Sequence, residues 1–289
     1  MRYLSAENTR AALSMLDAIE AMRHAFSGDA ETPLRTMVGG SLVMPGRLDD
    51  LIAVKVVSIV PGNPAGLVVV FGADGSPVGL VDGPTLTSIR TAAVCGLATQ
   101  LLTSDQPKTL AMLGAGAMAF DQIEAIRAVR QIDGVLVWSR SREKATAMAL
   151  RVGGEAVADA GDAVAQAKVV SCATPATRPL FDESALRSGT HINAVGAFTP
   201  DMVEVPAAVV KRAYVVVDDV DAAAAEAGDL IQAGRGPDAT LAELLVGAHP
   251  QIGSDVTLFK SVGVAAQDVA AAHRALTNAE ASGLGVELS

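Results

Sequence analysis

A glycine-rich segment in the middle of the chain has the spacing of a phosphate-binding turn. The segment KTLAMLGAGAMAFDQIEAIRAV (Lys108 to Val129) is apolar up to Gly114-Ala115-Gly116 and then continues with helical spacing. Gly114, Gly116 and Ala119 form the pattern GxGxxA, in which the first glycine permits a sharp turn and the second lets the backbone approach a pyrophosphate. The N-terminal N–H groups of the following helix would point at the phosphates. We therefore predict a dinucleotide site here; the alternative is a bare structural turn.

The end of the next expected strand indicates which dinucleotide fits. Sites for NAD usually have an Asp or Glu at this position, bound to the ribose 2'-hydroxyl. This chain instead reads Trp138-Ser139-Arg140-Ser141-Arg142, without an acid. An arginine can bind the 2'-phosphate of NADP, and the flanking hydroxyls can donate to it, so the sequence favours NADP(H) over NAD(H). The alternative is that Arg140 and Arg142 only begin a solvent-exposed helix.

Cationic residues in the first third of the chain have apolar or small neighbours. Arg35 lies in TPLRTMVGG, Lys55 in IAVKVVSIVPGN and Arg90 in LTSIRTAAVCG. A lysine inside a strand loses hydration at a cost unless an anion binds it, so these residues predict a pocket for a carboxylate. The alternative for Lys55 is an outward position on an amphipathic edge strand.

The elements around these residues change from helix, to β-structure, to regular βα alternation. Apolar spacing predicts one amphipathic helix from Ala6 to Phe26, β-rich runs over 36–46, 51–60 and 65–83, with GADGSP as a hairpin turn, and a helix over 85–102. Beyond Pro107 the pattern predicts a helix after the glycine turn, another from Arg142, a last helix over 263–285, and the strands Thr109–Leu113, Val135–Trp138, Lys168–Ala173, His191–Val195, Ala213–Val217 and Val256–Phe259.

This alternation indicates an α/β protein with a Rossmann-type doubly wound parallel sheet and a smaller α+β domain. We predict a substrate-binding and dimerisation domain over 1–104, completed by the C-terminal helix 266–289. The dinucleotide-binding domain is expected over 105–265.

Composition excludes several other classes. Half of the 289 residues are apolar, which argues against a disordered chain. The net charge of -10 argues against a nucleic-acid-binding surface. No apolar run is long enough to span a membrane, and the N-terminus is too polar for a signal peptide, so we expect a soluble cytoplasmic protein. The four histidines lack zinc-site spacing. Cys95 and Cys172 lie in apolar runs and are expected to be buried thiols.

Taken together, several motifs resemble the ornithine cyclodeaminase/mu-crystallin family over nearly the whole chain. They are LTSIRTAA, GAGAMA, HINAVGAFTPDMVEV, VVVDDVDAAAAEAGDL and LFKSVGVAAQDVAAA, in the family's order. The resemblance implies hydride transfer between a nicotinamide and the Cα that carries an amine or imine beside a carboxylate. It also implies a homodimer built through the first domain.

The resemblance also implies roles for individual residues. Arg35, Lys55 and Arg90 would hold the substrate carboxylate, and Lys55 could take part in proton transfer. Asp218 matches the family's catalytic aspartate; from the sequence alone it could instead cap the next helix, although Asp219 or Asp221 could do so equally well. The cofactor residues implied by the phosphate turn and the resemblance are Gly114, Ala115, Gly116, Ala117, Met118, Ser139, Arg140, Ser141, Thr174, the segment around Val195, the segment from Ser261 to Gly263, and Thr91 on the nicotinamide side.

The sequence departs from the family pattern in two segments. A Pro- and Thr-containing stretch that the family commonly has after Asn63 is missing, and no glutamate lies between Arg35 and Lys55 to meet the side-chain amine of ornithine. We therefore expect an NAD(P)H-dependent reductase of a small linear or cyclic imino acid, reversible as an amino-acid dehydrogenase. The alternatives are a cyclodeaminase that recycles NAD and a non-catalytic protein that binds small carboxylates in the presence of the cofactor.

Overall fold

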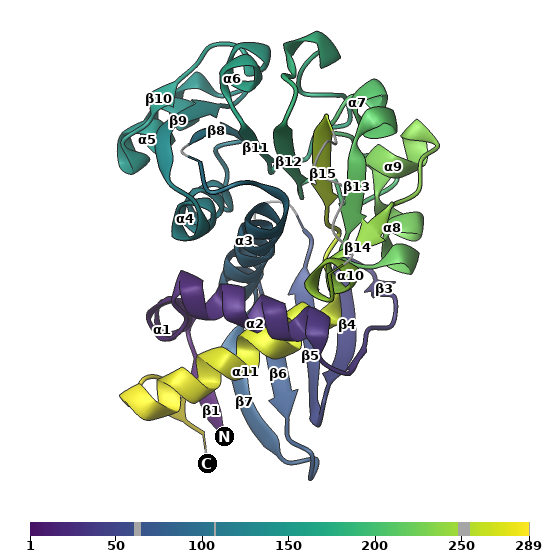
Figure 1. Ribbon diagram of the computed structural model, residues 1–289. Helices are drawn as coiled ribbons and strands as arrows, with labels where there is room; N and C mark the ends of the chain where they lie inside the picture. Colours follow the sequence, from purple (N-terminus) through teal and green to yellow (C-terminus); the bar gives the residue numbers. More distant parts are fainter. Residues whose placement is uncertain (61–64, 107, 248–254, 289) are drawn as a thin grey trace. The chain divides into compact units, whose positions relative to one another are not determined.

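The computed structural model describes residues 1–60, 65–106, 108–247 and 255–288 (Figure 1). They form two compact units, Met1–Val94 with Gly263–Ser289, and Cys95–Val262. The sequence predicts these boundaries at 104/105 and 265/266. The shortened segment after Asn63 falls in 61–64, outside the described residues.

The first unit is built on one mixed sheet. Its described strands are β1 (Arg2–Leu4), β2 (Ala30–Glu31), β3 (Thr36–Val38), β4 (Ser41–Leu48), β5 (Leu51–Ser58), β6 (Gly66–Phe71), β7 (Pro77–Asp82) and β16 (Val286–Glu287). The order is β16-β1-β7-β6-β5-β4-β2, and β3 pairs with β4. The pair β1–β7 is parallel and the others are antiparallel. The GADGSP hairpin between β6 and β7 is confirmed, with Gly75 at φ 77°.

Helices cover one face of this sheet. Helix α11 (Ala265–Ser282) lies across the strands, and α2 (Met15–Ser27) packs alongside α11, as Figure 1 shows in yellow and purple. The prediction of a single helix from Ala6 to Phe26 is wrong. Helix α1 (Ala6–Ala12) ends at an extended Leu13, and the Ser14 side chain accepts the N–H of Asp17 to begin α2. Helix α3 (Gly83–Leu102) begins in this unit and continues into the second.

Alternation along β5 decides which way Lys55 points. Ala53 and Lys55 are buried on the face that carries α11, whereas Ile52 and Val56 are exposed on the opposite face. Because β5 lies between β4 and β6, the alternative of an edge strand with Lys55 outward is wrong.

The second unit is a parallel sheet with the predicted βα alternation. Its strands are β8 (Lys108–Leu113), β9 (Ile132–Trp138), β10 (Glu155–Ala156), β11 (Val169–Cys172), β12 (Thr190–Ala194), β13 (Tyr214–Val217), β14 (Ala239–Thr240) and β15 (Val256–Lys260), in the order β10-β9-β8-β11-β12-β15-β13-β14. Its helices are α4 (Ala119–Val129), α5 (Arg142–Val152), α6 (Ala160–Gln166), α7 (Ala207–Arg212), α8 (Val220–Glu226), α9 (Gly228–Ala233) and α10 (Leu241–Leu245), with a 3-10 turn, η1 (Glu183–Ala185). The Rossmann-type sheet is confirmed.

The strand order reverses between β8 and β11. From β8 the chain adds β9 and β10 on one side, and then returns to the other side of β8 for β11 and β12. In such sheets the connections diverge at this point and leave a crevice beyond the carboxyl ends of the two strands. Packing of α4 and α5 on β8 and β9 buries the core of this half.

Both cysteines of the chain lie in the described residues. Cys95 and Cys172 are both buried free thiols, as predicted. Within these ranges no group of His, Cys, Asp and Glu side chains is arranged to hold a metal ion, and no helix is long and apolar enough to cross a membrane.

Candidate active site

The phosphate turn follows β8 as a tight loop. Gly114 has φ 119°, and a Cβ at this position would lie 2.8 Å from the carbonyl oxygen of Ala173. A Cβ on Gly116 would meet nothing within 4 Å, so the backbone there borders open space. Ala119 is fully buried at the start of α4. These are the three requirements of a turn that lets a pyrophosphate approach the backbone.

A cavity of about 790 Å³ opens at the crevice between β8 and β11. It is lined by Gly114, Ala115, Gly116, Trp138, Ser139, Arg140, Lys144 and the segment 173–180. Six predicted cofactor residues therefore come together: Gly114, Ala115, Gly116, Ser139, Arg140 and Thr174. Other predicted residues of the same unit do not line this cavity, namely Ala117, Met118, Ser141, Val195 and Ser261. Thr91 and Gly263 belong to the first unit.

The loop after β9 and the first turn of α5 each supply a cation to this cavity. Arg140 is exposed, and Lys144 also lines the wall, which the sequence reading had missed. The Ser141 side chain accepts the N–H of Lys144 and caps α5, so its hydroxyl proton is still available to donate. The alternative of a helix start fits Arg142, the first residue of α5, but Arg140 precedes the helix and faces the cavity.

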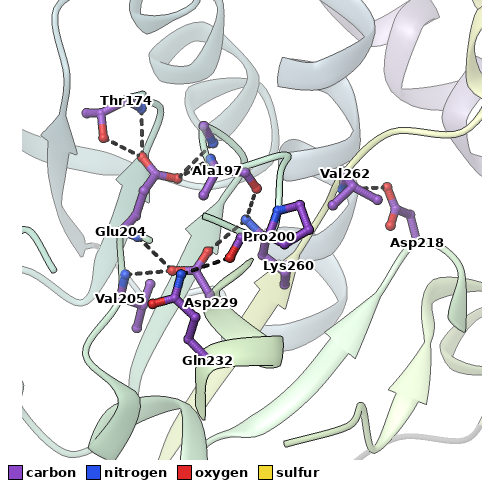
Figure 2. Close-up of polar contacts among 11 residues, drawn as sticks. Thr174, Ala197, Pro200, Glu204, Val205, Asp218, Asp229, Gln232, Lys260 and Val262 are labelled. Atoms are coloured by element: carbon purple, nitrogen blue, oxygen red, sulfur yellow. Dashed lines mark hydrogen bonds and ion pairs between the residues drawn. The ribbon is translucent and has the colours of Figure 1, made fainter. Parts of the chain in front are cut away.

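A buried carboxylate, Glu204, ties together the loops that follow β11 and β12 (Figure 2). Its Oε1 accepts the N–H of Thr174 at 2.6 Å and the Thr174 hydroxyl at 2.8 Å. Its Oε2 accepts the N–H of Gly196 at 2.7 Å and that of Ala197 at 3.1 Å. Burial raises the pKa of Glu204, while Lys260 and the Thr174 donors oppose the shift.

A second buried carboxylate supports the first. Asp229 accepts the N–H groups of Glu204 and Val205 at 2.7 and 2.9 Å, and its other oxygen lies 2.8 Å from Lys260 Nζ. Lys260 also donates to the carbonyl oxygen of Ala197 (Figure 2). Lys260 and Asp229 are both fully buried, so each offsets the other's loss of hydration.

Asp218 directly follows β13 and does not serve as a helix cap. It is 5% exposed and accepts the Ser261 hydroxyl at 2.7 Å and the N–H of Val262 at 3.1 Å. The cap of α8 is Asp219, whose side chain accepts the N–H of Ala222. The capping role is therefore filled by the neighbouring acid, as the sequence reading allowed.

In the first unit, Lys55 and Arg90 share one buried carboxylate. Lys55 Nζ lies 2.7 Å from Asp268 Oδ2, and Arg90 Nε lies 3.2 Å from Asp268 Oδ1, with all three side chains buried. Arg90 also donates from Nη1 to Gln267 Oε1 at 2.6 Å. Asp268 lies in the first turn of α11, where the helix dipole favours a negative charge.

The cations outnumber the anion in this cluster. Burial lowers the pKa of Lys55 from its ordinary 10.5 to about 8; Asp268 opposes the shift, and Arg90 and Arg35 add to it. Gly263 leaves room for the Arg90 guanidinium, because a Cβ there would lie 2.6 Å from Nη1. Lys55 and Arg90 against Asp268 leave an excess positive charge, which a further carboxylate would compensate.

Several buried charges were missed from the sequence. They are Asp268, Glu204, Asp229 and Lys260. The signal was present, because Lys260 lies in VTLFKSV and Asp268 in VGVAAQDVAAA, and both are charged residues inside apolar runs. The argument applied to Lys55 would have selected both.

The comparisons with known proteins agree with this geometry. The model of the ornithine cyclodeaminase/mu-crystallin family matches residues 4–283. The chain belongs to this family. It is 35% identical to the Delta(1)-pyrroline-2-carboxylate reductase of Bacillus cereus, over 99% of this chain and 98% of the relative. It is 33% identical to the ketimine reductase mu-crystallin of Mus musculus, over 93% of this chain and 95% of the relative.

Two solved structures share the fold of this chain. The Delta(1)-pyrroline-2-carboxylate reductase of Thermococcus litoralis, in complex with NADH and L-proline, matches with a TM-score of 0.93 and 31% identity over the whole of both chains. An archaeal alanine dehydrogenase dimer with bound NAD matches with a TM-score of 0.91 and 27% identity, over 100% of this chain and 99% of that one.

Replacing Asp268 by Asn should destabilise the first unit of this family member. The change leaves Lys55 and Arg90 without their buried counter-charge, for which a loss of about 3–5 kcal/mol is typical. The exposed Asp29, paired with Arg47, provides the control, and Asp29→Asn should cost less than about 1 kcal/mol. Urea unfolding followed by circular dichroism measures both.

The pH dependence of this loss follows from Lys55. Its folded pKa of about 8 lies below the ordinary 10.5, so the folded protein binds fewer protons than the unfolded chain between these values. Without Asp268 the pKa falls further, so Asp268→Asn should cost less at pH 9 than at pH 7. An equal cost at both values would show that Asp268 does not stabilise the Lys55 ammonium.

Proposed function

We propose that this chain is an NAD(P)H-dependent imine reductase that transfers hydride to the Cα of a small imino acid and can run in reverse as an amino-acid dehydrogenase. The observation that carries the proposal is the buried cluster of Lys55, Arg90 and Asp268, with its excess positive charge. A substrate carboxylate is the anion that such a cluster fits. The ketimine and pyrroline-2-carboxylate reductases among its relatives act on substrates of this class.

The residues of the second unit fit a nicotinamide dinucleotide. Gly114 and Gly116 would hold the pyrophosphate, and Arg140 with Lys144 would bind a 2'-phosphate, so we favour NADP(H), with NAD(H) as the alternative. When bound, the cofactor supplies the hydride. We also propose the predicted roles of Ser139, Ser141 and Thr174 beside the dinucleotide.

The chain's own residues supply orientation and protons. Arg90, Lys55 and Arg35 would fix the carboxylate, which orients the neighbouring C=N carbon. An acid must keep the imine nitrogen protonated, because the iminium accepts hydride more readily than the neutral imine. We assign this role to Asp218, which directly follows β13 and is not used as a cap, with the Lys55 ammonium as a second proton source.

A substrate panel tests this function directly. NADPH oxidation should be observed with cyclic imino acids such as pyrroline-2-carboxylate or piperideine-2-carboxylate. Their carboxamides should react about ten- to a hundredfold more slowly in kcat/KM, because a charge-assisted bond contributes about 1.5–3 kcal/mol. kcat/KM should fall above about pH 8, where Lys55 loses its charge. NADPH binding without turnover of any imine would favour a carboxylate-binding protein instead.

Cofactor preference should depend on Arg140. Arg140→Ala removes a cation at the cavity and should weaken NADPH binding about ten- to a hundredfold while leaving NADH binding nearly unchanged. Arg142→Ala, on the exposed start of α5, is the matched control and should affect neither cofactor. Equal loss of both cofactors in Arg140→Ala would contradict the assignment. Fluorescence titration of both cofactors measures the dissociation constants.

The role of Asp218 can be separated from that of its neighbour. Asp218→Asn keeps the shape but cannot transfer a proton, so kcat should fall by about two to four orders of magnitude with NADPH affinity unchanged. Asp219→Asn keeps a good helix cap and should keep most of the activity. Steady-state kinetics on both variants measures the effect. An active Asp218→Asn variant would show that Lys55 or water donates the proton instead.

We also propose a homodimer formed through the outer face of the first unit's sheet. Ile52, Val56 and Leu67 project from β5 and β6 on the face opposite α11 and are between 42 and 46% exposed. Monomeric proteins rarely leave an apolar strip of this kind in water. An alanine dehydrogenase with this fold is a dimer.

Charge on this face should therefore break the dimer. Val56→Lys combined with Leu67→Lys should lower the mass measured by light scattering from two chains to one. Leu150→Lys is the control, because Leu150 is 83% exposed on α5 of the second unit and is not part of the proposed interface of the first unit's sheet. A dimer that persists in the double variant would exclude this face.

A further inference from the structure

We infer that Glu204 is a positioning residue for the dinucleotide, because its carboxylate fixes the loop after β11 that forms one wall of the cavity. This inference rests on the proposed use of that cavity by NAD(P)H. Glu204 lies in the segment GAFTPDMVEV. It is neither a helix cap nor one of the proposed catalytic residues, and the inference assigns it a function.

The carboxylate of Glu204 joins two loops at the carboxyl ends of neighbouring strands. Thr174 follows β11, and Gly196 with Ala197 follows β12, and all three backbone N–H groups donate to the same side chain (Figure 2). A Cβ on Gly196 would lie 2.1 Å from the Thr174 nitrogen, so the two loops are in direct contact. The Glu204 carboxylate therefore holds the two loops together by accepting hydrogen bonds from both.

The loop that Glu204 holds, which contains Thr174, lies beside the phosphate turn at Gly114. Thr174 lines the cavity, and a Cβ on Gly114 would lie 3.0 Å from Thr174 Cγ2 and 2.8 Å from the Ala173 oxygen. A shift of the Thr174 loop by a fraction of an ångström would therefore either press on the turn or open a gap beside it. Thr174 therefore links Glu204 to the phosphate turn, because it is hydrogen-bonded to the carboxylate and lies beside the turn.

The hydrogen bonds from Thr174, Gly196 and Ala197 require an ionised carboxylate at residue 204. The three backbone N–H groups can only donate, so both oxygens of residue 204 must accept. A glutamine of the same size would turn its NH₂ group towards at least one of these N–H groups and leave it unpaired. Asp229 and Lys260 stabilise the arrangement, because Asp229 holds the Glu204 backbone and Lys260 offsets the buried negative charge.

Glu204→Gln tests the inference. The variant should bind NADPH and NADH about ten- to a hundredfold more weakly, and alike for both, since it alters the shared pyrophosphate region. Trp138, the chain's one tryptophan, lines the cavity, so its fluorescence reports dinucleotide binding. At saturating cofactor, kcat and the imino-acid KM should stay within about threefold of the unmodified protein.

Two further variants separate positioning from stability. Glu204→Asp keeps the charge and should bind dinucleotide more tightly than Glu204→Gln. Glu243→Gln changes an exposed carboxylate in the capping box of α10 and should leave binding unchanged. A Glu204→Gln variant with a lower melting temperature but an unchanged dissociation constant would overturn the inference and leave Glu204 a structural residue only.

Hydrogen exchange tests the inference on the unmodified protein, so the test does not depend on whether a variant folds. Without dinucleotide, the amides of Thr174, Gly196 and Ala197 should exchange slowly with deuterium, since Glu204 already holds them. Rapid exchange of these amides would overturn the inference. If the unmodified protein shows no change in Trp138 fluorescence with either dinucleotide, the proposed function fails first, which distinguishes the two failures.

Discussion

A charge placed in a protein interior must have a partner, and both units of this chain are organised around that requirement. In the first unit, Asp268 of α11 meets Lys55 of β5 and Arg90 of α3, so one carboxylate connects a strand and two helices. In the second unit, Lys260 and Asp229 neutralise each other beside Glu204. Neither arrangement is needed to form a hydrophobic core. Apolar side chains at the same positions would be buried without the free-energy cost of removing charged groups from water. We interpret both as devices that give up stability to place polar groups accurately.

The two arrangements differ in their net charge, and the difference matches the two proposed ligands. The first unit keeps more positive than negative charge among Lys55, Arg90 and Asp268, which suits a substrate carboxylate. In the second unit the Glu204 carboxylate is used on backbone N–H groups, so it shapes a loop rather than binding a ligand. The phosphates would then be bound by the turn at Gly114 and by Arg140 and Lys144.

Much of this could be predicted from the sequence, because periodicity and glycine spacing are local signals. The βα series, the GxGxxA turn and the Ala-rich α3 follow from patterns within about 20 residues. The break at Leu13 was missed because the apolar spacing continues across it, while the Ser14 cap that divides the helix is a single hydrogen bond. Strands of two or three residues, such as β10 and β14, carry too few positions for a pattern. Asp268 and Glu204 could not be assigned partners, because Lys55 and Thr174 lie 213 and 30 residues away in the chain and only the fold brings them together.

Hydride transfer to a carbon beside a carboxylate is the central claim, and an isotope experiment tests it most directly. NADPH carrying two deuterium atoms at C4 of the nicotinamide would be incubated with the protein and pyrroline-2-carboxylate, and the product analysed by NMR and mass spectrometry. The account predicts proline with one deuterium, located at Cα. Proline without deuterium, or NADPH oxidation without any proline, would contradict it.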